Sequence, residues 1–141
     1  MLRKILLLLP LVASPALAED LHYDGSDPLL CTLMTLQQCD FAGCEHVDVE
    51  RVGIPKYVIA DFKKKQISST EYSGVNLVTP IGGVKQVDNR LVLQGVDEAS
   101  EDAEDAKAWT MVVAEPTGMM TFTVAAEESA LVAFGACAPI E

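Results

Sequence analysis

Basic side chains are scarce in this sequence. Its 141 residues include ten Lys and Arg against 21 Asp and Glu, so the formal net charge is −11. A surface of this sign repels the phosphates of nucleic acids and of anionic lipid headgroups. We therefore exclude nucleic acid as a partner and expect a basic protein or a cation to bind more easily.

Long apolar runs are also missing. The most apolar stretch, residues 5–12, is too short to cross a bilayer as a helix. It follows Arg3 and Lys4 and precedes small residues that end at Ala18, which is the pattern of a cleaved secretory signal. We predict that residues 1–18 are this signal and that the protein is exported to the periplasm or the cell exterior, with no stable membrane anchor.

Removal of the signal leaves 141 − 18 = 123 residues with a net charge of 8 − 21 = −13, because two basic residues are lost with it. A chain of this length suits one domain that buries about two thirds of its unfolded surface. We predict that residues 19–141 form this single domain.

One segment has helical spacing, and the rest alternates. Leu29, Leu33 and Leu36 recur at intervals typical of a helix, which we predict over about residues 28–39. Beyond it, short segments of period two are separated by turns about every ten residues. These predict an antiparallel β-meander in a small sandwich or barrel. The predicted strands cover residues 57–62, 66–70, 75–79, 84–87, 90–95, 109–114, 119–125 and 131–136.

Only four cysteines are present, and an even number in an exported chain predicts two disulfides. The paired C-x-x-C motifs typical of a zinc site are absent, so disulfides are the better interpretation. On the predicted helix, Cys31 and Cys39 would lie roughly 12 Å apart along the axis, too far for a bond. Two pairings stay open: Cys31 to Cys137 with Cys39 to Cys44, or Cys31 to Cys44 with Cys39 to Cys137.

The hairpin over residues 109–125 has two possible registers. A tight loop at Pro116 and Thr117 places Trp109 opposite Val124 and stacks the large apolar residues on one face. A left-handed bulge at Gly118 would instead shift the partners by one residue. Both registers remain open at this stage.

An acidic stretch interrupts the meander at residues 97–105. It is too charged for a core strand, and we predict a solvated loop. It lacks the residue spacing and the glycine of a calcium-binding loop, so an electrostatic docking role is the better interpretation. The docking residues would be Asp97, Glu98, Glu101, Asp102, Glu104 and Asp105.

A metal site could form at His46, Asp48 and Glu50, which alternate with valines and would share one face of a strand. The same alternation is typical of any half-buried strand, and that interpretation is favoured.

Catalytic and cofactor-binding motifs are lacking. Only two histidines are available as general bases. The chain also has no G-x-S-x-G motif and no phosphate-binding loop followed by a helix. We expect a non-enzymatic exported binding or accessory protein without a cofactor. The alternatives are an acidic inhibitor of a basic enzyme such as a lysozyme, and a carrier of a small apolar ligand in a β-barrel.

Overall fold

The computed structural model describes residues 22–97 and 106–140. The described part consists of strands, turns and one short 3-10 helix, η1 (Glu71–Ser73), and none of its helices is long and apolar enough to span a membrane. The strands are β1 (Leu29–Asp40), β2 (Gly43–Val47), β3 (Tyr57–Asp61), β4 (Gln66–Ser69), β5 (Val78–Pro80), β6 (Gly83–Val87), β7 (Arg90–Asp97), β8 (Lys107–Ala114), β9 (Met119–Ala125) and β10 (Ala130–Pro139).

The helix predicted over residues 28–39 is wrong, because this segment is the long strand β1. Leu29, Cys31 and Leu33 alternate toward the interior, as strand residues do. A β-bulge between Leu33 and Thr35 then shifts the alternation by one residue and returns Leu36 to the interior. The resulting spacing of three between Leu33 and Leu36 imitates helical periodicity.

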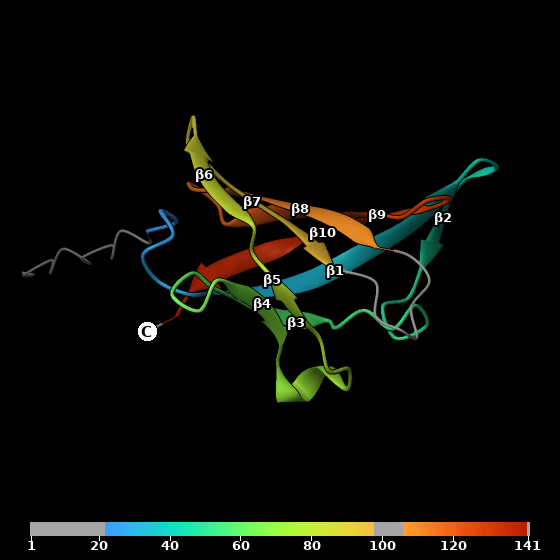
Figure 1. The fold of residues 1–141 in the computed structure, drawn as a ribbon, viewed down its shortest axis with the longest axis horizontal. Coiled ribbons are helices and arrows are strands. Elements are labelled where there is room, and N and C mark those ends of the chain that lie inside the picture. The colour runs from blue at the N-terminus through green and yellow to red at the C-terminus, as the bar shows by residue number, and fades with distance from the viewer. Residues whose placement is uncertain (1–21, 98–105, 141) are drawn as a thin grey trace, which may run out of the picture.

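All strands join one antiparallel sheet, in the order β5-β4-β3-β1-β10-β9-β8-β7-β6, with β2 paired to the end of β1 (Figure 1). The sheet curls into a half-barrel, which favours the barrel over the sandwich of the prediction. Its two ends approach each other, since Ile81 N–H donates to Lys65 O and Gly82 N–H donates to Gln94 O. The chain thus passes from the β4 side of the sheet to the β7 side within a few residues.

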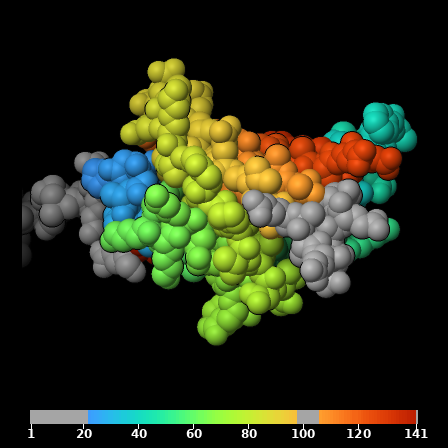
Figure 2. Space-filling view, in the orientation of Figure 1, coloured from blue at the N-terminus to red at the C-terminus, as the bar shows by residue number. Residues whose placement is uncertain are grey.

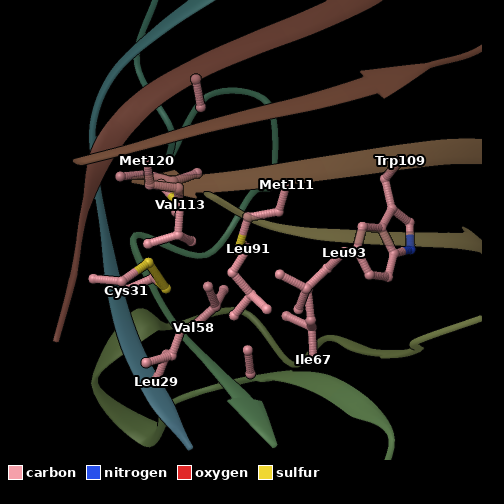
Figure 3. Close-up of a cluster of buried hydrophobic side chains, with 14 of the residues drawn as sticks. Leu29, Cys31, Val58, Ile67, Leu91, Leu93, Trp109, Met111, Val113 and Met120 are labelled. Carbon is pink, nitrogen blue, oxygen red and sulfur yellow. A yellow bond between two sulfur atoms is a disulfide. The ribbon is translucent and has the colours of Figure 1, made fainter. Parts of the chain in front are cut away.

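The concave side of the sheet holds the core (Figure 3). Leu91, Leu93 and Met111 are fully buried there, opposite Leu29 and Ile67 from the other half of the sheet. These residues come from alternate positions of their strands, as the period-two pattern predicts.

Two disulfides cross-link the sheet: Cys31 to Cys137, between β1 and β10, and Cys39 to Cys44, across the β1–β2 hairpin. The first is inside the core, where it is visible beside Val58 in Figure 3. The alternative pairing is therefore wrong. Cys31 and Cys39 do not pair, but on a strand the reason is a separation of about 26 Å rather than a helix. Two disulfides indicate an oxidising environment outside the cytoplasm.

The β8–β9 hairpin has the register in which Trp109 faces Val124, Met111 faces Phe122 and Val113 faces Met120. Gly118 is nevertheless left-handed, with φ of 67°. Both features coexist because the N–H groups of Thr117 and Gly118 donate to the same carbonyl, Ala114 O, and close the turn without shifting the strands.

Gly135 allows β1 and β10 to approach closely at the bulge. A Cβ at this position would collide with the backbone carbonyl of Thr32, which has no freedom to move aside. We therefore expect Gly135→Ala to lower the free energy of unfolding by about 1 to 3 kcal/mol, as overpacking does. Urea denaturation measures this loss.

Gly83→Ala in β6 is the matched control, since a Cβ there meets nothing within 4 Å. It should change stability by less than about 0.5 kcal/mol. A Gly135→Ala variant as stable as this control would contradict the close approach of the two strands.

Candidate binding site at the open end of the half-barrel

One end of the half-barrel is closed by the N-terminal segment. Tyr23 is 5% exposed, and its hydroxyl donates to Cys137 O at 3.1 Å. Gly118 lies directly against the Tyr23 ring, where any larger residue would collide with it. The β8–β9 turn therefore packs against the Tyr23 side chain at this end.

The opposite end, here called the open end, is formed by the β1–β2 and β9–β10 turns, the adjoining ends of β7 and β8, and the loop of residues 48–56. These parts lie together on the right of Figure 1. Strand pairing explains the grouping, because β1, β7 and β9 all run toward this end and their partners all run away from it.

An apolar pocket of about 150 Å³ enters the interior at the open end. Its wall comes from Trp109, Phe122, Val124 and Leu131 on three adjacent strands, and the loop of residues 48–56 forms the facing side. Asp97 and Lys107, paired residues of β7 and β8, also line it. The pocket lining is therefore mostly apolar and includes one acidic and one basic side chain.

Trp109 organises the base of this pocket. Its indole N–H donates to the buried hydroxyl of Thr79 at 3.0 Å, and its ring packs 6.0 Å from that of Phe122. The same ring lies over Gly95, where a side chain would collide with it. Trp109 thus bridges β8 to β5 and β7 and holds the two ends of the curled sheet together.

The open end is acidic. Arg51, Lys56 and Lys107 are its described basic residues. Its described carboxylates, here called the open-end carboxylates, are Asp40, Glu45, Asp48, Glu50, Asp97, Glu127 and Glu128.

None of the open-end carboxylates forms an ion pair with another described residue. Within residues 22–97 and 106–140, the ion pair that does form joins Lys64 to Asp61 at the closed end. There, a hydrogen bond from the Lys64 N–H lowers the pKa of the Asp61 carboxyl. The negative charges of the open end are therefore available to a partner.

The sequence-predicted residues divide between described and undescribed segments. His46 lies in β2, but the strand ends at Val47, and Asp48 and Glu50 follow in a turn. In the described segments, no three His, Cys, Asp or Glu side chains gather closely enough to hold a metal ion. Asp97 ends β7 beside the pocket, whereas Glu98, Glu101, Asp102, Glu104 and Asp105 lie outside the described residues, as does the predicted signal.

Sequence reasoning missed the apolar pocket. Trp109, Phe122 and Val124 were predicted only as strand residues, because the loop of residues 48–56 that faces them is distant in sequence and shares no pattern with them. The shared register of Trp109 and Val124 was the available indication that they line the same face.

The open end can contact an apolar group and a positively charged surface at the same time, a combination typical of protein–protein interfaces. Comparison of the chain with protein-family models, with curated proteins and with solved structures finds no match.

Proposed function

We propose that this protein is a non-enzymatic exported binding protein that docks a positively charged protein on its open end. The carrying observation is that the open-end carboxylates lie at the same end of the half-barrel as an apolar pocket, which Asp97 lines, and have no ion-pair partner among the described residues. The disulfides and the predicted signal support a site of action in the periplasm or outside the cell.

The negative charge of the open end favours a basic protein as its partner. Clustered charges of one sign steer an oppositely charged protein toward the surface and exclude proteins of like charge. The opposite end carries most of the described basic side chains, including Lys63, Lys64 and Lys65 in the β3–β4 turn. A basic partner is therefore attracted to one end in particular, as expected of an inhibitor of a basic enzyme such as a lysozyme.

The volume of the pocket beside Trp109 is small for a drug-sized ligand. Sites for drug-sized ligands have volumes of about 300 to 1,000 Å³, whereas this pocket has about 150 Å³. It suits a single ring or one side chain of a docking protein. Because Trp109 is the sole tryptophan, its fluorescence reports directly on anything that enters.

The test removes charge from one end at a time. The open-end variant carries Glu45→Gln, Glu127→Gln and Glu128→Gln, and the closed-end control carries Asp27→Asn, Asp88→Asn and Glu115→Gln. Both lose the same net charge. With a lysozyme as the probe, surface plasmon resonance should show association about tenfold slower for the open-end variant and nearly unchanged for the control.

Added salt should weaken wild-type binding toward that of the open-end variant, because it screens the same charges. Equal losses in the two variants would instead reveal a nonspecific net-charge effect. Failure to bind any of a lysozyme, a basic ribonuclease and a basic serine protease would refute the proposal. A saturable change in Trp109 fluorescence with a small apolar compound alone would favour the carrier.

A further inference from the structure

The tip of the β1–β2 hairpin presents one aromatic side chain to solvent. Phe41 is 95% exposed, more than any other large apolar residue of the described chain. It occupies the two-residue turn between Asp40 and Gly43. The β1–β2 hairpin, in cyan, projects from the right-hand end of the surface in Figure 2. An aromatic ring held so far from the core contributes almost nothing to folding through burial.

The turn around Phe41 is rigid. The Asp40 carboxylate accepts hydrogen bonds from the N–H groups of Ala42, at 2.7 Å, and Gly43, at 3.2 Å. Asp at the first position and Gly at the fourth are preferred in a tight turn, whereas the turn itself has no need of phenylalanine. The local structure is therefore set by the residues beside Phe41, and the ring is free to serve another purpose.

A disulfide joins the strands directly below this turn. Cys39 and Cys44 are paired residues of β1 and β2, separated by five positions in sequence. This bond reduces the freedom that the turn would lose on binding, and such preorganisation favours affinity. The disulfide-linked hairpin therefore holds Phe41 in a defined position at its turn.

The surroundings of Phe41 carry charge of one sign. Residues 37–50 contain Asp40, Glu45, Asp48 and Glu50 and no Lys or Arg. A partner that accepts this ring must therefore bring an apolar recess into contact with a carboxylate-rich hairpin. A recess with basic groups at its rim satisfies both requirements.

We propose that Phe41 is the anchor of the interface and inserts into an apolar-floored cleft of the basic partner. This inference rests on the proposed function and deepens it, because it names the inserted side chain and the concave shape of the partner. If the cleft is the active site of an enzyme, insertion blocks it and inhibition is competitive with substrate. Buried aromatic anchors are typical of binding hot spots.

Phe41→Ala tests the anchor, with Phe41→Tyr as the conservative variant and Tyr72→Ala as the matched control. Tyr72 is 83% exposed on η1, away from the hairpin. Measured by surface plasmon resonance with the three basic enzymes named above, Phe41→Ala should raise Kd by roughly thirtyfold, mostly through faster dissociation. Phe41→Tyr and Tyr72→Ala should remain near wild type, and the unfolding midpoint should not change for any of them.

The salt dependence separates the two proposals. Phe41→Ala removes no charge, so its affinity should fall with salt as steeply as that of wild type. If wild-type binding weakens with salt and Phe41→Ala binds with the same affinity as wild type, the anchor role of Phe41 is refuted and the proposed function is retained. Absence of wild-type binding to all three enzymes would overturn both.

A second variant tests the disulfide of the hairpin. Cys39→Ser with Cys44→Ser keeps Phe41 and every carboxylate but releases the hairpin. It should weaken binding several-fold, since the turn then loses more freedom on docking. Wild-type affinity in this variant would overturn the role of the disulfide in presenting Phe41.

Discussion

Replacement of both Cys31 and Cys137 by alanine is expected to lower the free energy of unfolding by roughly 4 to 5 kcal/mol. The two residues are separated by 106 positions in sequence, and the bond removes the freedom of that long loop from the unfolded chain. Both side chains are also buried, so their truncation weakens core packing. Urea denaturation followed by Trp109 fluorescence measures the loss.

The second disulfide supplies an internal control. Cys39 and Cys44 close a loop of only five residues, and the same chain-entropy model gives about 2 kcal/mol for their joint replacement. The free energy of unfolding should therefore be highest for wild type, lower for the variant that lacks Cys39–Cys44, and lowest for the variant that lacks Cys31–Cys137. Equal losses, or the reverse order, would contradict the dominant role of the long-range bond.

Trp109→Ala is expected to lower the free energy of unfolding by about 3 to 5 kcal/mol, as truncation of a large core aromatic does. The indole ring packs against Gly95 and Phe122 and donates to Thr79, so its removal separates the two ends of the curled sheet. Urea denaturation followed by far-ultraviolet circular dichroism measures this variant, which has no tryptophan fluorescence.

Trp109→Phe isolates the hydrogen bond. It keeps an aromatic ring but leaves the buried Thr79 hydroxyl without its donor, at a cost of about 1 to 3 kcal/mol. Adding Thr79→Val removes the unpaired hydroxyl and should restore much of that loss. A double variant that is no more stable than Trp109→Phe alone would contradict this account.

The meander was predictable because strands leave a local signal. The alternating pattern and turn residues placed β3, β4, β6, β7, β8, β9 and β10 close to their observed bounds. The strand predicted at residues 75–79 is instead the shorter β5, Val78–Pro80, since the chain there continues from η1 through a turn. Alternation identifies a strand well but locates its ends poorly when few residues are paired.

Parts of the candidate site were only partly predictable. The excess of acidic residues was visible in the composition, and it led to the hypothesis that these residues bind a basic partner. The exposure of Phe41 was not visible, because its segment lay beside a misassigned helix and its neighbours were considered for metal binding instead. Only after β1 and β2 are known to pair does Phe41 stand at the apex of a hairpin.

By itself, the sequence determined the β-rich class, the acidic surface and the presence of cross-linkable cysteines, because alternation, charge and residue type are local properties. The tertiary structure decided the rest: that residues 29–40 form a strand, which cysteines pair, and how the sheet curls around Trp109. These depend on contacts between distant segments. The bulge after Leu33 shows why, since one extra residue in β1 is needed to return Leu36 to the core, and along the chain alone that spacing is the same as that of a helix.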